Sequence, residues 1–299
     1  MSWIGRHDLL QVLRTAASCS GTTQPDLLLG SIMSTLFFEP STRTRLSFEA
    51  AICKLGGKVI GFSDAGISSA RKGESLADTV RMVERYSDVI VLRHPYEGAA
   101  RLASEVSRVP VINGGDGSNQ HPTQTFLDLY TIDQLFPGQL AEGGRPLTIA
   151  LAGDLRYGRT VHSLLAALAH FDVEILTVAV PGLELPEHHQ QIAHRRGLSI
   201  TVADNLAEAI RHADVLYMTR LQEERFPDPL EFDHIKSSYR ISAVMLGDAK
   251  RSLRILHPLP RINEIARDVD DTQHAHYFVQ AGNGLPVRQA ILGMVLGAL

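Results

Sequence analysis

Short apolar runs alternate with longer amphipathic segments along this chain, and that alternation restricts its fold more than any other feature. In the first half, strand-like runs lie at residues 32–38, 59–62, 89–92 and 109–112. Segments with helical spacing of apolar residues separate them, at residues 44–55, 75–86 and 98–107. Strands that alternate with helices pair in parallel through right-handed crossovers. The pattern therefore predicts a parallel sheet wrapped by helices.

A second alternation follows a helical pattern at 122–136 and the hydrophilic loop PGQLAEGGRP. Its strand-like runs are 147–152, 175–180, 200–202, 215–218 and 254–256, and its helices include 160–170 and 207–212. A chain of 299 residues suits two domains of about 150 residues each. We predict an α/β fold with two doubly wound parallel-sheet domains. They span residues 1–132 and 133–286, and a C-terminal helix at 287–299 packs back on the first.

Charge and hydropathy argue against several classes of function. The formal net charge is −4 and the sequence pI is about 6.3, which gives no basic face for nucleic acid. No apolar run approaches the roughly 20 residues that span a bilayer, and residues 1–13 read as a helix rather than a signal peptide. We expect a cytoplasmic protein that binds neither nucleic acid nor membrane.

No pattern of metal ligands stands out in the sequence. The two cysteines, Cys19 and Cys53, are too few for a disulfide framework or a structural zinc site, and Cys53 reads as a buried helix residue. The histidines at 188–189 and 274–276 lack the spacing of ligands on a helix face and are expected to be solvated at the surface. The sequence predicts no metal and no cofactor.

Polar side chains gather where the predicted strands end, which is where open α/β sheets bind ligands. In the stretch FFEPSTRTR, residues 37–45, Pro40 breaks the chain and Ser41 fits a helix N-cap. The first amides of that helix and the guanidinium of Arg43 suit a phosphate. Arg93, after a neighbouring strand, would neutralise a second negative charge. A capped helix with solvated arginines is the alternative on these residues alone.

The segment NQHPTQ, residues 119–124, forms a second polar cluster. His121 precedes Pro122, which favours extended backbone at the mouth of the next helix, where an imidazole can donate to a carbonyl. Thr123 and Gln124 can read an oxygen or an NH₂ group. A solvated or structurally bonded histidine is the alternative for His121.

The segment GDLRYGRT, residues 153–160, offers a rival interpretation. It differs from the phosphate-loop pattern G-x-x-x-x-G-K-[ST] by Arg159 in place of lysine. That lysine reaches the terminal phosphates of a nucleotide, and no apolar strand here ends in the acidic residue expected to hold Mg²⁺. ATP binding or hydrolysis would distinguish a nucleotide-binding protein from an anion-binding enzyme.

Three separated motifs together resemble the carbamoyltransferases, and among them the aspartate carbamoyltransferase family. They are F-x-E-P-S-T-R-T-R at 37–45, H-P-T-Q at 121–124 and H-P-L-P-R at 257–261, and the likeness covers nearly the whole chain. The ornithine-using branch of the family typically reads H-C-L-P and carries an S-M-G motif, and this chain has neither. The resemblance implies transfer of a carbamoyl group from carbamoyl phosphate to L-aspartate, the committed step of de novo pyrimidine biosynthesis. The alternative is a homologue without catalytic activity, although every motif residue is present.

The resemblance also assigns residues to the two domains. In the first, carbamoyl phosphate would contact Ser41, Thr42, Arg43, Thr44, Arg93, His121 and Gln124. In the second, aspartate would contact Arg159, Arg220, Gln222 and the backbone carbonyls of Leu259 and Pro260. The catalytic roles fall to His121, Arg43, Thr44, Arg93 and Lys72. The amine attacks through a tetrahedral oxyanion and phosphate leaves, so neither metal nor covalent intermediate is required.

In the family, a mobile loop of the adjacent subunit completes each site, and Ser68 and Lys72 match its positions. The loop is rich in glycine and serine, as a moving segment should be. The resemblance therefore implies a homotrimer with active sites shared between subunits. It leaves room for a regulatory chain or a partner enzyme, and no effector site is recognisable in this sequence.

Overall fold

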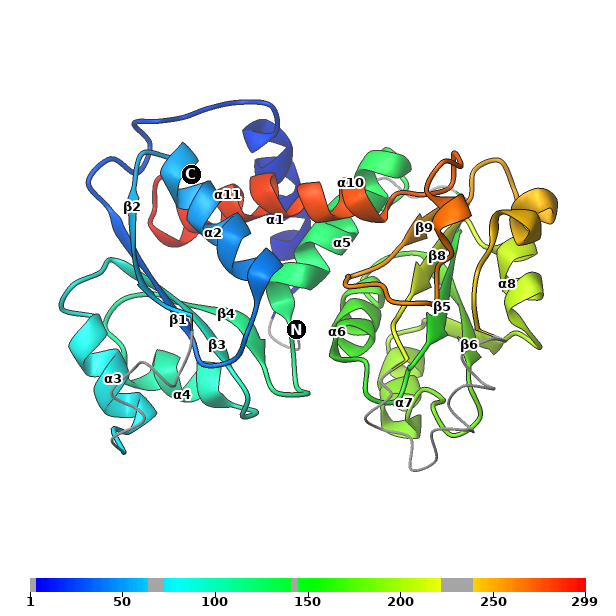
Figure 1. Cartoon of the computed structure of the whole chain (residues 1–299), viewed down its shortest axis with the longest axis horizontal. Coiled ribbons are helices and arrows are strands. Elements are labelled where there is room, and N and C mark those ends of the chain that lie inside the picture. Colours follow the sequence, from blue (N-terminus) through cyan, green and yellow to red (C-terminus); the bar gives the residue numbers. More distant parts are fainter. Residues whose placement is uncertain (1–3, 64–72, 141–144, 222–238) are drawn as a thin grey trace. The chain divides into compact units, whose positions relative to one another are not determined.

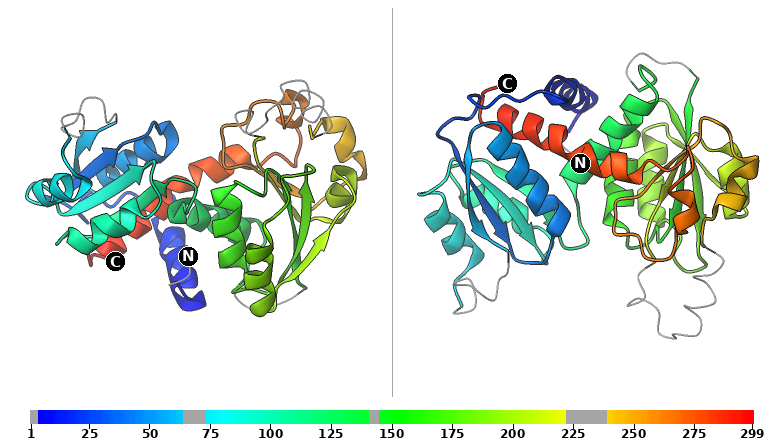
Figure 2. Two further views of the ribbon diagram at one scale, coloured as in Figure 1. Left: turned by 90° about the horizontal axis from the view of Figure 1, so that it is seen from below. Right: turned by 45° about the horizontal axis from the view of Figure 1, so that its top comes forward.

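The computed structural model of this chain describes residues 4–63, 73–140, 145–221 and 239–299. It contains two compact units (Figures 1 and 2). The N-terminal unit consists of His7–Tyr130 and Asn283–Leu299, and the C-terminal unit consists of Met1–Arg6 and Thr131–Gly282. The chain passes from one unit to the other within helix α5 (Pro122–Leu135).

The N-terminal unit has a sheet of four parallel strands in the order β2-β1-β3-β4. These are β1 (Ile32–Phe37), β2 (Lys58–Phe62), β3 (Val89–His94) and β4 (Val111–Asp116). Strand β1 is central, since Met33 pairs with Val59 on one side and Val89 on the other. The side chains of β1 and β3 are nearly all buried, as expected for a parallel sheet that is covered on both faces.

Helices cover both faces of this sheet (Figure 1). Helices α3 (Leu76–Val83) and α4 (Ala99–Val106) pack on one face. Their apolar side chains form a cluster with those of β1 and β3, made of Leu36, Val80, Val83, Ile90, Leu92, Ala100 and Ala103. Helices α2 (Thr42–Lys54) and α11 (Gly284–Val295) lie together over the other face, and α1 (Arg6–Cys19) precedes β1.

The C-terminal helix packs on the N-terminal unit, as predicted, because α11 lies against α2. It begins at Gly284 rather than at residue 287. Pro286 falls in its first turn, where a missing backbone N–H costs no intrahelical hydrogen bond. The helix ends at Val295, shortly before Gly297, whose φ of +70° is the left-handed conformation typical of helix C-termini.

The C-terminal unit has five parallel strands in the order β7-β6-β5-β8-β9. They are β5 (Leu147–Gly153), β6 (Val173–Ala179), β7 (Ser199–Val202), β8 (Val215–Met218) and β9 (Arg254–Leu256). One face carries α6 (Arg159–Leu168) and α7 (Glu187–Arg195), and the other carries α8 (Leu206–His212) and the 3₁₀ helix η4 (Ala243–Asp248) (Figure 1). The short elements η5 (Arg267–Val269) and α10 (Tyr277–Gly282) follow β9.

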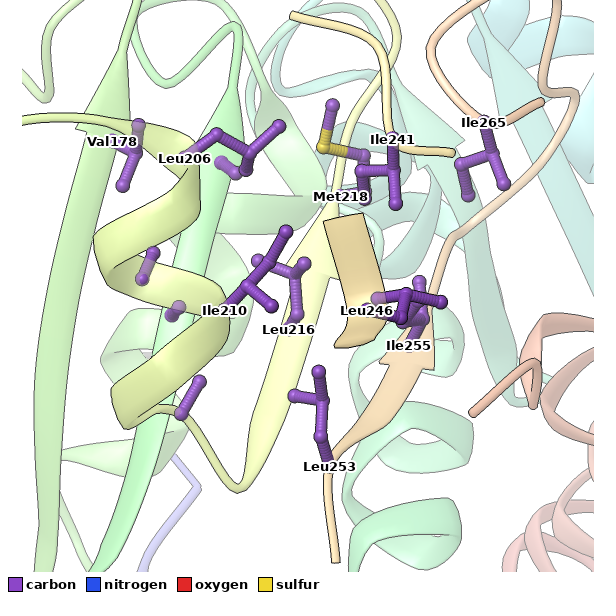
Figure 3. Packing of buried hydrophobic residues seen from close by; sticks show 14 of the residues in the cluster. Val178, Leu206, Ile210, Leu216, Met218, Ile241, Leu246, Leu253, Ile255 and Ile265 are labelled. Atoms are coloured by element: carbon purple, nitrogen blue, oxygen red, sulfur yellow. The ribbon is translucent and has the colours of Figure 1, made fainter. Parts of the chain in front are cut away.

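One large apolar cluster holds the second face of this sheet together (Figure 3). Leu206 and Ile210 of α8 pack with Leu216 and Met218 of β8, and all four side chains are buried. Each such side chain contributes about 1.5–3 kcal/mol through its removal from water. Both sheets are thus parallel and covered on both faces, and the predicted α/β fold with two doubly wound sheets is confirmed.

The expectation that Cys53 is buried is wrong, because the residue is exposed. The buried positions of α2 include Phe48, Ala51 and Ile52, and Cys53 falls on the next, outward position of the helix.

In the described parts of the chain, no helix is long and apolar enough to cross a bilayer.

Asp214 links three segments of the C-terminal unit just before β8. Its buried carboxylate accepts hydrogen bonds from Arg145 at 2.8 and 2.9 Å, from Lys250 at 3.1 Å and from the backbone N–H of Thr148 at 3.1 Å. We expect Asp214→Asn to lower the free energy of unfolding by about 2 kcal/mol, because two cations lose their counter-charge. Urea denaturation measures this change.

The matched control for Asp214 is Asp204→Asn in an exposed loop, expected within about 0.5 kcal/mol of wild type. Equal effects of the two substitutions would show that the buried carboxylate has no special role in stability.

Candidate active site

The first group of predicted site residues lies at the start of helix α2. Ser41 is the N-cap with extended backbone, at φ −157° and ψ 101°, and its side chain caps none of the described amides of the helix. The hydroxyl is therefore not used for capping. The amides of Thr42, Arg43 and Thr44 have no acceptor within the helix, and the positive end of the helix dipole lies among them. Such a terminus attracts an anion.

Arg93 lies beside this helix start, at the end of strand β3. The register of β1 and β3 pairs it with Phe37, four residues before Ser41. Its Nη2 lies 2.6 Å from Glu39 Oε1, and its Nη1 donates to the carbonyl of Gly114 at 3.3 Å. These two anchors hold the guanidinium at the carboxyl edge of the sheet, with the side chain 13% exposed.

Thr44 and His121 meet in this unit although they are far apart in the sequence. Thr44 Oγ1 lies 3.4 Å from His121 Nε2, and both residues are buried. The other ring nitrogen of His121 lies 3.5 Å from Thr123 Oγ1. The start of α5 therefore approaches the start of α2, and the donors expected to hold a substrate carbonyl come together.

A buried carboxylate organises the loop that carries His121. Asp116 accepts hydrogen bonds from the side-chain amides of Asn113 and Asn119, both at 2.9 Å, and from the backbone N–H of Gly98 at 3.0 Å. The residue is 2% exposed. These hydrogen bonds tie the loop that leads into His121 to Asn113 of β4 and to Gly98 before α4.

The second group lies at the carboxyl edge of the other sheet. Arg159 is the first residue of α6, after β5, and Arg220 follows the neighbouring strand β8. Gly153 ends β5 with a φ of +109°, and a Cβ atom there would lie 2.5 Å from the carbonyl oxygen of Thr219. Only glycine allows the two strand ends to approach so closely. The loops that lead to Arg159 and Arg220 thereby start side by side.

The segment after β9 is held in an uncommon conformation. Leu259 has a φ of +54°, in the left-handed region, and its bond to Pro260 is cis. The N–H of Leu259 donates to His257 Nδ1 at 2.8 Å, and Nε2–H of His257 donates to Glu264 at 2.8 Å. Burial alone would raise the pKa of Glu264, but the hydrogen bonds from His257 and from backbone N–H groups outweigh it and lower that pKa. His257 thus fixes the backbone whose carbonyls were predicted to contact substrate.

Two family profiles match this chain over most of its length. The one described as aspartate/ornithine carbamoyltransferase, carbamoyl-P binding domain, matches residues 2–134. The one described as aspartate/ornithine carbamoyltransferase, Asp/Orn binding domain, matches residues 145–295. The chain belongs to the aspartate/ornithine carbamoyltransferase family. The resemblance seen in the three motifs is confirmed.

Individual carbamoyltransferases are similar to nearly the whole chain. It is 58% identical over 270 residues to the aspartate carbamoyltransferase catalytic subunit of Thermococcus gammatolerans, covering 90% of this chain and 86% of the relative. The solved catalytic subunit of M. jannaschii aspartate transcarbamoylase has a TM-score of 0.91 at 48% identity, covering 99% and 96% of the two chains. Aspartate transcarbamoylase from Trypanosoma cruzi, solved with carbamoyl aspartate and phosphate, has a TM-score of 0.85 at 39% identity, covering 97% and 92%.

The structure distributes the predicted carbamoyltransferase site residues over the two units. The N-terminal unit carries, at or after the ends of β1, β3 and β4, Ser41, Thr42, Arg43, Thr44, Arg93, His121 and Gln124. The C-terminal unit carries, after the ends of β5, β8 and β9, Arg159, Arg220, Leu259 and Pro260. Ser68, Lys72 and Gln222 lie outside the described residues. The substrate contacts of all these residues stay predictions.

Three buried charged residues near the first group were not predicted from the sequence. They are Asp116, Asp128 and Arg288. Asp128 had a usable signal, because it lies four residues after Gln124 on a helix and so on the same face. Arg288 sits in an otherwise apolar helix and had none.

The expectation that the paired histidines are solvated is wrong in two places. His274 is buried, and its Nδ1 donates to the carbonyl of Leu253 at 2.9 Å. His189 stacks on His162 with ring centroids 3.9 Å apart, and burial together with the nearby histidines lowers the pKa of His189 to about 4. Within the described ranges, no group of three or more His, Cys, Asp or Glu residues is arranged to hold a metal ion.

Proposed function

We propose that this chain catalyses the reaction of carbamoyl phosphate with L-aspartate to give N-carbamoyl-L-aspartate and phosphate. The observation that carries the proposal is the high identity to aspartate carbamoyltransferase catalytic subunits through both domains. The reading H-P-L-P at residues 257–260, in place of H-C-L-P, favours aspartate over ornithine. By this reaction the chain takes part in pyrimidine biosynthesis.

The first domain, residues 1–132 with the helix 287–299, is proposed to bind carbamoyl phosphate. The phosphate would accept hydrogen bonds from the amides and hydroxyls of residues 41–44, and Arg43 and Arg93 would neutralise its two charges. The Ser41 hydroxyl, which caps none of the described amides of its helix, and the anchored Arg93 guanidinium support this arrangement. Gln124 would face the NH₂ of the carbamoyl group.

The carbonyl oxygen of the carbamoyl group would be held by His121, Thr44 and Arg93. Charge builds up on this oxygen as the tetrahedral intermediate forms, so donors aimed at it are worth about 3 kcal/mol each in the transition state. The buried contact of Thr44 with His121 supports this role, because few water molecules compete with donors in such a place. Arg43 and Lys72 would stabilise the charge that gathers on the departing phosphate.

The second domain, residues 133–286, is proposed to bind aspartate. Two carboxylates require cationic or amide anchors, which Arg159, Arg220 and Gln222 would supply. The carbonyls of Leu259 and Pro260 would accept hydrogen bonds from the attacking amine, and the rigid support of Leu259 by His257 favours this role. Holding two substrates in contact lowers the barrier by about 7–11 kcal/mol. The leaving phosphate is the acceptor for the amine proton.

The proposal includes the assembly. A homotrimer would let Ser68 and Lys72 of one subunit complete the site of its neighbour, as the family resemblance implies. The trimer is also the unit to which a regulatory chain or a partner enzyme would bind. We place the enzyme in the cytoplasm, because its charge and hydropathy show no preference for membrane or nucleic acid.

The test is a direct assay of the purified chain after treatment with a chelator. Incubated with carbamoyl phosphate and L-aspartate, it should form N-carbamoyl-L-aspartate and phosphate in equal amounts, with no added metal or nucleotide. L-ornithine replaces aspartate in the control reaction. A rate with ornithine equal to or above the rate with aspartate would contradict the assignment of aspartate as the substrate.

A further inference from the structure

The direction of one amide in the N-terminal unit is set by a neighbour further along the same helix. Gln124 and Asp128 lie one turn apart on α5, and Gln124 Nε2 donates to Asp128 Oδ1 at 2.8 Å. Gln124 is 9% exposed and Asp128 is fully buried. An ionised carboxylate only accepts hydrogen bonds, so the NH₂ of the Gln124 amide must face it. The amide oxygen of Gln124 therefore faces away from Asp128.

A buried cation lies near enough to this carboxylate for the two charges to interact. Arg288 of α11 is 3% exposed, and its guanidinium carbon lies 5.1 Å from the centre of the Phe48 ring. Burial lowers the pKa of Arg288 to about 10, and the charge of Asp128 opposes that shift, so Arg288 is protonated at neutral pH. A buried carboxylate near a buried cation is stabilised in its charged form.

The place of the Arg288 side chain is fixed by close packing. A Cβ atom added to Gly284, one turn earlier on α11, would lie 2.1 Å from Arg288 Nη1. The guanidinium thus fills the space that a side chain at 284 would need, while Phe48 of α2 faces it from a second helix. Leu127 of α5 also lies close, with its Cδ2 3.5 Å from the added Cβ atom, so α2, α5 and α11 meet around Arg288.

We propose that Asp128, with the buried Arg288 as its counter-charge, is a positioning residue that turns the oxygen of the Gln124 amide toward the NH₂ of carbamoyl phosphate. The inference rests on the proposed function, in which Gln124 faces that NH₂ group. The amide oxygen of Gln124 accepts a hydrogen bond from the NH₂ of the ligand. If the amide were flipped, its own NH₂ would face the NH₂ of the ligand, and two donors cannot form a hydrogen bond. The Asp128–Arg288 pair therefore selects a carbamoyl group over an acyl group of the same shape.

Acetyl phosphate is the probe for this selection, because a methyl group replaces the NH₂ and nothing else changes. Calorimetric titration without aspartate gives the Kd of both ligands, and their ratio is the carbamoyl preference. Gln124→Met keeps the length of the side chain and removes the acceptor. We expect it to lower the carbamoyl preference by about tenfold to a hundredfold.

Asp128→Asn should have nearly the same effect without touching the ligand. The asparagine oxygen turns toward Arg288, its NH₂ turns toward Gln124, and the glutamine amide flips. The carbamoyl preference should fall about as far as in Gln124→Met, while the Kd of acetyl phosphate stays within about threefold of wild type. The double variant Asp128→Asn, Arg288→Met removes the cation that drives the flip, and its preference should return to within about threefold of wild type.

The matched control is Asp133→Asn, nine residues after Gln124 on the same helix and so about 13 Å further along it. Its carbamoyl preference should equal that of wild type. The inference is wrong if folded Asp128→Asn keeps the wild-type carbamoyl preference. It is also wrong if this variant loses affinity for carbamoyl phosphate and acetyl phosphate equally. If Asp128→Asn does not fold, the double variant Asp128→Asn, Arg288→Met decides. A carbamoyl preference as low in this double variant as in Gln124→Met contradicts the inference. Failure of the wild-type chain to carbamoylate aspartate would instead overturn the proposed function.

Discussion

Replacing His121 with alanine should lower kcat by about a hundredfold to a thousandfold and weaken carbamoyl phosphate binding by less than about tenfold. The imidazole is buried, and its Nε2 lies 3.4 Å from Thr44 Oγ1, in the region proposed to hold the carbonyl oxygen. A donor there gains most when that oxygen becomes an oxyanion, so its loss appears in kcat rather than in ground-state affinity. Steady-state kinetics and a direct titration with carbamoyl phosphate measure the two quantities.

Two other substitutions give this experiment its contrast. Arg220→Ala should chiefly raise the KM for aspartate, because it would remove a grip on a carboxylate that is present in both the ground state and the transition state. His194→Ala, an exposed histidine of α7, should change neither constant. If His121→Ala and Arg220→Ala show the same kinetic pattern, the roles assigned to the two residues are wrong.

The position of the candidate site residues at the sheet edges was predictable for a simple physical reason. In a parallel α/β sheet all strands point the same way, so polar residues that follow successive apolar runs must meet at one edge. Ser41 and His121 follow non-adjacent runs in the sequence, yet the strand order places β1, β3 and β4 side by side. The same rule brought Arg159, Arg220 and Leu259 to the edge formed by β5, β8 and β9.

The ends of the elements were less predictable, because periodicity detects only apolar residues. Strand β3 extends to His94 and β4 to Asp116, so both continue into the polar residues near the candidate site. Helix α7, EHHQQIAHR, was not predicted at all. Only Ala193 is buried among its described residues, so its sequence carries almost no helical pattern of apolar side chains.

Buried charges were the hardest feature to predict. Asp128 and Arg288 lie far apart in the sequence, on helices whose contact depends on the whole N-terminal unit. In isolation an arginine in an apolar helix reads as a solvated residue, because burying its charge is costly without a partner. The spacing of Gln124 and Asp128 shows a shared helix face but does not show which way the amide points.

Variants of Arg43 and Lys72 test whether active sites are shared between subunits. In the proposed homotrimer, the Arg43→Ala and Lys72→Ala variants should each be nearly inactive, since each lacks one of the cations proposed to stabilise the leaving phosphate. In a closed ring every interface is equivalent, so a site would be whole when its own subunit carries Arg43 and the neighbour carries Lys72. Random co-assembly of the two variants in equal amounts should therefore restore about one half times one half, or a quarter, of the sites.

The comparison that decides the matter uses a second pair of variants. Arg43→Ala and His121→Ala both alter residues that one chain supplies to one site, so no subunit in their hybrids carries both groups and activity should stay at the level of the parents. Each pair is denatured together, refolded, and checked by native mass for hybrid trimers. If only the pair Arg43→Ala with Lys72→Ala recovers about a quarter of the wild-type specific activity, Lys72 acts in the site of a neighbouring subunit. Hybrids that form without such recovery would mean that Lys72 acts within its own chain, because only then does every site lack one of the two cations.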